Sequence, residues 1–116
     1  MTWVATGISD PSIAEGSMRE VVVAGLPMVV TRVDGALRAL SAVCPHLGGD
    51  LGDGTLTGRR LECPLHQAVF DVTTGAVLTD AFGVEPPSGD IEPVRTFPVR
   101  VNAGVVEVDA PGPGSS

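Results

Sequence analysis

The chain has 116 residues, with 14 acidic and 7 basic side chains, and its formal net charge is −7. This length fits one domain with a modest core, and a charge of this sign disfavours binding to nucleic acid or to anionic lipid. No apolar run is long enough for a transmembrane helix, and the first residues lack the basic and apolar regions of a signal peptide, so we expect a cytoplasmic protein with no membrane partner.

Short strands joined by tight turns dominate the predicted secondary structure. The apolar residues are mostly Val, Ala and Leu, and 15 Gly and 10 Pro indicate many turns. Asp34-Gly35 is a strong hairpin signal between two apolar runs. In chain order we expect strands at 3–6 and 19–24 with at most one helical turn in 9–16 between them, a turn at 25–27, a hairpin of 28–33 and 36–43, a short strand at 60–62, a hairpin of 69–72 and 76–78, and a hairpin of 94–101 and 105–108. This pattern favours an all-β sandwich or small barrel.

The two cysteines and two histidines of the chain fall into two short clusters. Cys44 and His46 form a Cys-x-His motif, and Cys63 and His66 form a Cys-x-x-His motif, with sixteen residues between the two. Thiolate and imidazole are the side chains that bind soft and borderline transition metals. The clustering therefore predicts a metal site built from all four residues.

Three other interpretations compete with a mixed-ligand metal cluster. A Cys44–Cys63 disulfide would leave the paired histidines unexplained, and two cysteines do not make a disulfide-rich scaffold. Two buried cysteines with two incidental histidines would make the paired spacing a coincidence. A structural zinc site is chemically sound, but zinc fingers usually place two cysteines in one cluster and two histidines in the other.

The residues around both clusters resemble those of Rieske-type ferredoxins. In this family a Cys-x-His motif is followed, at a spacing like the one found here, by Cys-x-x-His. The resemblance extends from Val4 to about Asp109. The matching residues are Cys44-Pro45-His46-Leu47-Gly48-Gly49-Asp50-Leu51, Cys63-Pro64-Leu65-His66, Phe70-Asp71 and Thr74-Gly75.

This resemblance implies one Rieske-type [2Fe-2S] cluster, with Cys44 and Cys63 on one iron and His46 and His66 on the other. Two thiolates and two neutral imidazoles leave the oxidised cluster close to neutral, whereas four thiolates leave a charge of about −2. A less negative cluster accepts an electron more readily, so its potential lies above that of an all-cysteine ferredoxin. We expect these four residues to bind the cofactor and its metal, and we identify no catalytic residue.

The resemblance also implies the Rieske fold, in which an antiparallel β-sandwich or barrel base carries a small inserted cluster-binding subdomain. We expect a single domain over residues 1–109, with the subdomain at about 42–79. Residues 110–116 are rich in Pro, Gly and Ser and are predicted to form a disordered tail. The stretch 80–93 is predicted to be a solvated loop, with two alternatives left open: it covers one flank of the cluster, or it shapes a partner surface.

Four positions differ from the high-potential Rieske proteins of respiratory complexes. Those proteins carry an extra cysteine in each ligand loop, where this chain has Gly49 and Leu65. They also carry a Ser and a Tyr whose hydroxyls donate to sulfur, where this chain has Ala68 and Phe70. Because donors to sulfur stabilise the reduced cluster, their absence predicts a low potential.

The resemblance is strongest to the ferredoxin component of bacterial aromatic-ring-hydroxylating dioxygenases, which act in aromatic hydrocarbon catabolism. Such a ferredoxin is an electron-transfer component and not an enzyme. It carries single electrons from an NAD(P)H-dependent flavin reductase to a terminal Rieske non-haem iron oxygenase. Two alternatives stay open, the small Rieske subunit of an assimilatory nitrite reductase and a zinc-stabilised binding module. We expect the partner face to surround the tips of His46 and His66 and to include Leu47, Pro64, Leu65 and Gln67.

Overall fold

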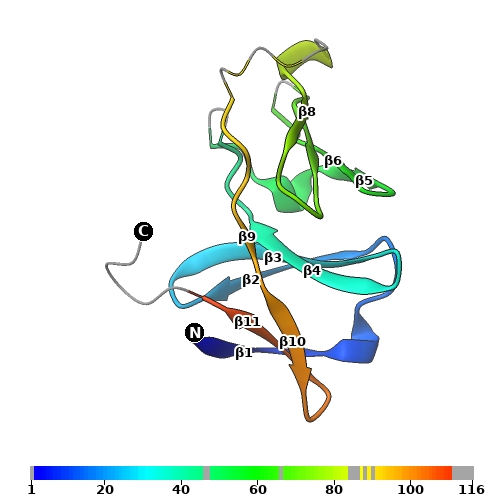
Figure 1. Ribbon diagram of the computed structural model, residues 1–116, viewed down its shortest axis with the longest axis vertical. Helices are drawn as coiled ribbons and strands as arrows, with labels where there is room; N and C mark the ends of the chain where they lie inside the picture. Colours follow the sequence, from blue (N-terminus) through cyan, green and yellow to red (C-terminus); the bar gives the residue numbers. More distant parts are fainter. Residues whose placement is uncertain are drawn as a thin grey trace.

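The computed structural model describes residues 2–45, 48–65, 67–83, 87, 89 and 91–110, and this part of the chain is all-β (Figure 1). Single-turn 3₁₀ helices lie between some of the strands. The strands are β1 (Trp3–Ser9), β2 (Met18–Val23), β3 (Leu26–Val33), β4 (Ala36–Ser41), β5 (Thr55–Thr57), β6 (Arg60–Glu62), β7 (Val69–Asp71), β8 (Val77–Thr79), β9 (Thr96–Phe97), β10 (Val99–Asn102) and β11 (Val105–Asp109), and the 3₁₀ helices are η1 (Asp10–Ser12), η2 (Leu51–Asp53) and η3 (Ala81–Gly83).

The strands form three antiparallel sheets, with orders β1-β11-β10, β2-β3-β4-β9 and β5-β6-β7-β8. The first two sheets make the base of the molecule. The third sheet is inserted between β4 and β9 in the chain and stands above the base in Figure 1. Its hairpin residues lie within the range 42–79 expected for the inserted subdomain. The all-β fold expected from the sequence is thus confirmed.

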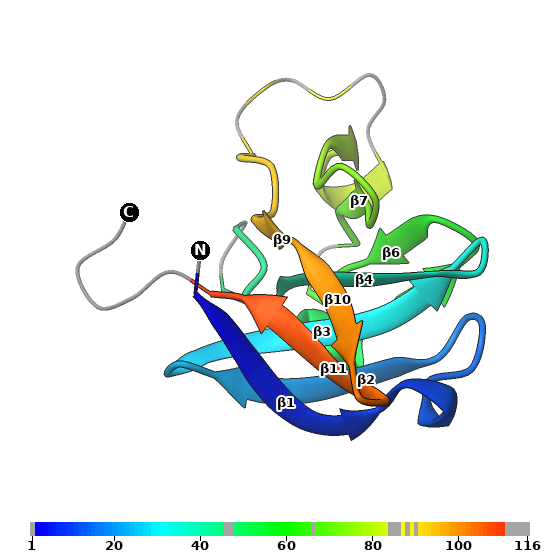
Figure 2. The same cartoon turned by 60° about the horizontal axis from the view of Figure 1, so that its bottom comes forward.

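The sheet β2-β3-β4-β9 is the middle layer (Figure 2), and its strand β3 is buried on both faces. On β3, Met28 and Val30 pack into a core with residues of the β1-β11-β10 sheet, such as Val106. Val29 and Val33 face the opposite side and join a second core with residues of the inserted sheet, such as Phe70. Because alternate residues of a strand face opposite sides of a sheet, this double burial explains why β3 has an almost uninterrupted apolar sequence.

Three hairpins of the base turn through two residues that both have positive φ. The pairs are Ala24-Gly25 (φ 51° and 80°), Asp34-Gly35 (54° and 79°) and Ala103-Gly104 (51° and 79°). Positive φ at both positions is the type I′ geometry that matches the twist of the flanking strands. The turn expected at 25–27 was misplaced. It lies at Ala24-Gly25, because Pro27 belongs to β3, where it is paired with Val22.

Pro98 divides the expected strand 94–101 into two. The residues before it form β9, which pairs with β4, and the residues after it form β10, which pairs with β11. Proline has no N–H to donate to a sheet, and here the chain passes at Pro98 from the middle sheet to the outer sheet. This crossing ties the two layers of the base together.

A glycine in the β7–β8 connection holds the inserted sheet against the segment that returns to the base. The Gly75 N–H donates to the Asp71 carbonyl, and the Gly75 carbonyl accepts from the Val94 N–H at 2.9 Å. Gly75 has φ of +80°, and a Cβ at this position would overlap the Val94 carbonyl oxygen. Only glycine satisfies both the conformation and the close approach.

The end of the base extends further than expected. Ala110, where we expected the tail to begin, is fully buried and its N–H donates to the Thr2 carbonyl at 2.9 Å. Residues 111–116, and with them the rest of the predicted tail, lie outside the described residues, as do several residues of the loop 80–93. Within the described part of the chain, no helix is long and apolar enough to cross a membrane.

Candidate cluster-binding site

Each cysteine begins a loop that is closed by the same backbone hydrogen bond. In the first cysteine loop, residues 44–49, the Cys44 N–H donates to the Gly49 carbonyl at 2.7 Å. In the second cysteine loop, residues 63–68, the Cys63 N–H donates to the Ala68 carbonyl at 2.8 Å. The two loops therefore fix their cysteine backbones in equivalent ways, although one loop follows a strand of the base and the other lies in the inserted sheet.

Hydrogen bonds and one buried side chain fix the first cysteine loop at the end of β4. The Leu51 N–H donates to the Ala42 carbonyl at 2.7 Å, and the Ala42 N–H donates to the Pro27 carbonyl at 2.9 Å. Leu51 is fully buried and begins η2, whose N-cap Asp50 accepts from the Gly52 N–H at 2.9 Å. The loop is thus held on both sides.

The second cysteine loop closes the β6–β7 hairpin. Glu62 at the end of β6 pairs with Val69 at the start of β7, directly below the loop. Within the loop, Gln67 takes a positive φ of 64°. The strand pair therefore sets the position from which Cys63 projects.

The two loops touch at Gly49. A Cβ at this position would lie 3.0 Å from the Cys63 Sγ atom and 3.2 Å from the Leu65 Cδ1 atom. Gly49 and Leu65 are the two positions where respiratory Rieske proteins were expected to carry extra cysteines. In this chain they are neighbours, and the absence of a side chain on Gly49 leaves room for the Cys63 sulfur.

Both cysteines are buried, and neither is in a disulfide. Cys44 has an exposed fraction of 1% and Cys63 of 0%, and both belong to the core between the middle sheet and the inserted sheet. Two buried cysteines on touching loops, with no disulfide between them, fit the thiolate half of the ligand set predicted for a [2Fe-2S] cluster. His46 and His66 lie outside the described residues. Without them, the described residues contain no group of three or more Cys, Asp, Glu or His that could hold a metal.

Apolar side chains around the two loops are exposed to solvent. Val43, just before the first loop, is 48% exposed, and Leu65 in the second loop is 47% exposed. Pro64 and Gln67 are exposed as expected for the partner face, whereas Leu47 lies outside the described residues. Val43 was not expected there. Its position at the end of an apolar strand run gave no signal that it would be exposed.

The two positions without hydroxyl groups lie inside the protein. Ala68 and Phe70 are both fully buried, and Ala68 is bonded through its carbonyl to the Cys63 N–H. Position 68 is the last residue of the second cysteine loop, so a side chain there already lies within that loop. The absence of a hydroxyl at Ala68 therefore bears directly on the polarity around Cys63.

Three carboxylates gather beside the first cysteine loop. A hydrogen bond to Asp50, burial, and the charges of Asp50 and Asp53 together raise the pKa of Glu20 above its usual value. Among the described residues, these carboxylates have no arginine partner. A hollow of about 200 Å³ lies next to both this cluster and the loop. It is lined by Glu20, Pro27, Ala42, Val43, Gly48, Gly49 and Asp50.

Comparisons with known proteins agree on one family. The family model "Rieske [2Fe-2S] domain" matches residues 2–98. The ferredoxin component of the naphthalene 1,2-dioxygenase system of Pseudomonas putida is 36% identical over 108 residues, which are 92% of this chain and 94% of the relative. These relatives are ferredoxin components of dioxygenase systems rather than their catalytic subunits. The matches give no support to the nitrite reductase alternative.

Solved structures show the same relationship. The ferredoxin of carbazole 1,9a-dioxygenase from Nocardioides aromaticivorans IC177 aligns with a TM-score of 0.76 and 28% identity over 93% of this chain and 97% of that chain. A chain in a complex of reduced oxygenase and oxidised ferredoxin in carbazole 1,9a-dioxygenase aligns with a TM-score of 0.76 and 31% identity, over 91% of each chain. Fold, sequence and the two buried cysteines therefore agree: the chain belongs to the Rieske [2Fe-2S] family, its cofactor is a Rieske [2Fe-2S] cluster, and the relatives named here are ferredoxin components of aromatic dioxygenase systems.

Proposed function

We propose that this protein is a one-electron carrier of a multicomponent aromatic-ring-hydroxylating dioxygenase. It takes electrons from an NAD(P)H-dependent flavin reductase and delivers them to a terminal Rieske non-haem iron oxygenase. The observation that carries the proposal is the pair of buried cysteines, not joined in a disulfide, on touching loops beside the exposed apolar side chains of Val43 and Leu65. The relatives named as ferredoxin components of naphthalene dioxygenase support the same role.

We assign the cluster ligands as Cys44 and Cys63 on one iron and His46 and His66 on the other. The bound cluster supplies a centre that gains and loses one electron. The backbone bonds from Cys44 to Gly49 and from Cys63 to Ala68 fix the loops on which all four ligands lie. A preformed scaffold of this kind reduces the movement that accompanies a change of charge, which favours rapid transfer.

The partners dock, in this proposal, on the rim around the two cysteine loops. Val43 and Leu65 are each about half exposed, and apolar side chains over a redox centre suit the small, brief contacts that redox partners make. The solved complex of oxygenase with ferredoxin in carbazole 1,9a-dioxygenase supports an oxygenase as one of these partners. A net charge of −7 adds long-range attraction to basic partner surfaces.

The proposal keeps the cytoplasmic location that the sequence predicts. Its support is the likeness to bacterial ferredoxin components of dioxygenase systems.

Reconstitution of the three-component system tests the proposal. Purified holoprotein, a flavin reductase of a naphthalene-type system and its terminal oxygenase are combined with NADH and naphthalene, and dihydroxylated product is measured. We expect product only when all three proteins are present, at a rate that rises with the concentration of this protein until it saturates. Equal product without it, or none with it while the reductase reduces it normally, would contradict the proposed delivery to the oxygenase.

A further inference from the structure

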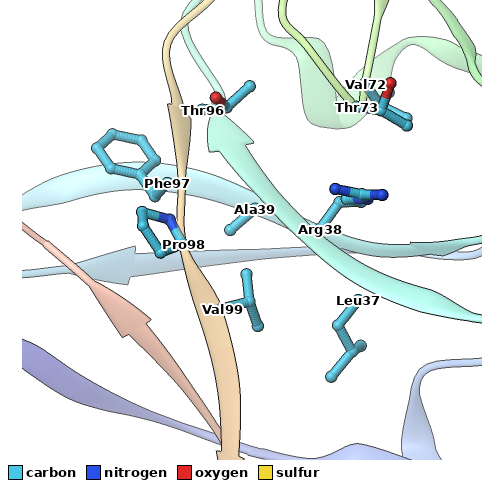
Figure 3. Close-up of a pocket in the computed structure, with 9 residues that line it drawn as sticks. All are labelled: Leu37, Arg38, Ala39, Val72, Thr73, Thr96, Phe97, Pro98 and Val99. Carbon is cyan, nitrogen blue, oxygen red and sulfur yellow. The ribbon is translucent and has the colours of Figure 1, made fainter.

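A groove of about 460 Å³ lies where the β7–β8 turn of the inserted sheet meets the base, away from the two cysteines (Figure 3). A volume of this size is within the range of small-molecule sites. Its walls come from β4, from the consecutive strands β9 and β10, and from the turn after β7. The lining residues are Leu37, Arg38, Ala39, Val72, Thr73, Thr96, Phe97, Pro98 and Val99.

Arg38 lies in this groove without an acceptor for its guanidinium group. Figure 3 shows the guanidinium projecting from β4 into the space below Thr73. Its Nε atom is buried without a hydrogen-bond partner, and no carboxylate of the described residues forms an ion pair with Arg38. An arginine has five N–H donors, and a donor that is shielded from water, as Nε is in Arg38, costs free energy when it is unpaired. A ligand with acceptor oxygens would satisfy them.

The surroundings of the groove are positive although the protein as a whole is acidic. Arg59 donates to the Thr73 hydroxyl at 2.9 Å, and the Arg95 guanidinium lies 5.0 Å from the centre of the Phe97 ring. No lining residue is acidic. Arg38 therefore lines the groove, and Arg59 and Arg95 each contact one of its lining residues.

The carboxylate of Asp71, which bonds to the lining residue Thr73, is already engaged. Asp71 accepts from the Thr73 N–H and hydroxyl with one oxygen and from Arg59 with the other. Although burial acts against it, these hydrogen bonds lower the pKa of Asp71, so the carboxylate stays charged and committed to those donors. The Asp71 carboxylate is therefore not available to neutralise the charge of the Arg38 guanidinium.

We propose that this groove binds a small organic anion, a carboxylate attached to a flat apolar body. The planar guanidinium of Arg38 matches the two oxygens of a carboxylate. The partly exposed apolar side chains of Leu37, Pro98 and Val99 offer contact to the remainder of the ligand rather than to a fully hydrated inorganic ion. This inference is independent of the electron-carrier role, because the groove contains none of the residues assigned to the cluster.

Titration of ¹⁵N-labelled holoprotein with sodium benzoate, followed by NMR, tests the inference, with sodium acetate and inorganic phosphate as comparison probes. We expect saturable benzoate shifts of the backbone amides of residues 37–39, 72–73, 96–97 and 99, with acetate and phosphate at least tenfold weaker. Arg38→Met should weaken benzoate binding about tenfold or more, the loss expected for a charge-assisted hydrogen bond. Arg38→Lys, which keeps the charge but not the planar fork, should fall between the two.

Arg19→Met provides the matched control, because Arg19 is an exposed arginine on β2 outside the groove. It should bind benzoate like the wild type. Absence of saturable shifts at the groove, or equal affinity in Arg38→Met, would overturn the proposal. Phosphate binding as tight as benzoate would overturn the apolar part of the ligand class. Slower oxygenase reduction by Arg38→Met, with no benzoate binding to the wild type, would assign the groove to a carboxylate of a partner protein and also overturn the proposal.

Discussion

Gly49 is the residue at which the geometry of the site is most sensitive to a single added atom. It lacks the positive φ that favours glycine, yet a Cβ would lie 3.0 Å from the Cys63 sulfur. Its neighbour Gly48 has φ of +74° and open space around it. The two adjacent positions thus require glycine for different reasons: Gly49 because of a close approach, and Gly48 because of its left-handed backbone.

Gly49→Ala should therefore loosen the contact between the two cysteine loops. We expect the holoprotein of this variant to lose its visible cluster absorption several-fold faster than the wild type on warming. Gly48→Ala is the matched control, and it should show only the backbone strain of about 1–2 kcal/mol of a left-handed alanine. Equal rates of bleaching in the wild type and Gly49→Ala would show that the contact does not matter for retention of the cluster.

A hydroxyl at position 68 should raise the reduction potential. Ala68 is buried and hydrogen-bonded to the Cys63 backbone, so a serine there can donate to cluster or ligand sulfur. We expect the wild type near the low end of the Rieske range, roughly −150 mV, and Ala68→Ser to raise it by some tens of millivolts, since about 59 mV is a tenfold change for one electron. Protein-film voltammetry measures both values. Ala39→Ser, an equally buried change in the base core, should leave the potential unchanged, and a shift of the same size there would refute the sulfur-donor explanation.

The carboxylates beside the first loop should make stability depend on pH. The pKa of Glu20 is raised by the Asp50 hydrogen bond, by burial and by the nearby charges, so the folded state holds this proton more tightly than the unfolded state. Stability from this group is present below the ordinary value of 4.5 and is lost as the pH rises through the raised value. Glu20→Gln should thus raise the Tm only slightly at neutral pH, because Glu20 is exposed and its interactions are screened by solvent, and should give no gain below pH 4.5. Scanning calorimetry at both pH values measures the change in Tm, with the exposed Glu92→Gln as control. A larger rise in Tm in acid than at neutral pH would contradict the expected direction of the pH dependence.

At the scale of elements, the connection between the inserted sheet and the base depends on Gly75. Gly75 and Gly35 share nearly the same φ, +80° and +79°, but only Gly75 faces a carbonyl oxygen. Gly35→Ala should cost about 1–2 kcal/mol from backbone strain alone. Gly75→Ala should cost roughly 1–3 kcal/mol more because the Val94 segment must move. Chemical denaturation of both variants gives the two free energies of unfolding, and equal values would mean that the Gly75–Val94 contact is not tight in solution.

Local turn chemistry made most strands predictable, and tertiary pairing accounts for the failures. The Asp34-Gly35 hairpin and the strand at β6 follow from turn residues and alternation in the sequence. The Ala24-Gly25 turn was misplaced because Pro27 is a frequent turn residue, and β5 was missed because Thr55–Thr57 is short and flanked by glycines. The break at Pro98 depends on which sheet each half joins, which no local pattern specifies.

Part of the site was predictable from its motifs. The clustering of Cys44 and Cys63 with the two histidines predicted one shared metal site, and the structure brings the two cysteine loops into contact through Gly49. The exposure of Val43 and the unpaired guanidinium of Arg38 were not predictable. Both depend on how separate sheets meet, and sequence spacing carries no information on that.

At the scale of the whole molecule, the effect of an added charge on partner binding should depend mainly on where the charge is placed. Leu65 and Val101 are exposed to nearly the same extent, 47% and 45%, but Leu65 lies on a cysteine loop and Val101 on β10 of the base. Leu65→Glu should slow reduction by the reductase about tenfold, close to 1.4 kcal/mol, with an unchanged visible spectrum. Val101→Glu adds the same charge and should have little effect. Stopped-flow reduction of both variants decides between the two faces, and the opposite ranking would move the docking surface to the base.

Direct electron delivery to the oxygenase is the central claim, and a single-transfer experiment tests it most directly. Chemically reduced protein is mixed anaerobically in a stopped-flow instrument with oxidised terminal oxygenase of a naphthalene-type system, and oxidation of this protein is followed by its visible absorption. We predict a saturable reaction that is at least as fast as the turnover of the complete system. Oxidation that is slower than turnover, or no faster than in a mixture without oxygenase, would contradict the assignment of this protein as the oxygenase's electron donor.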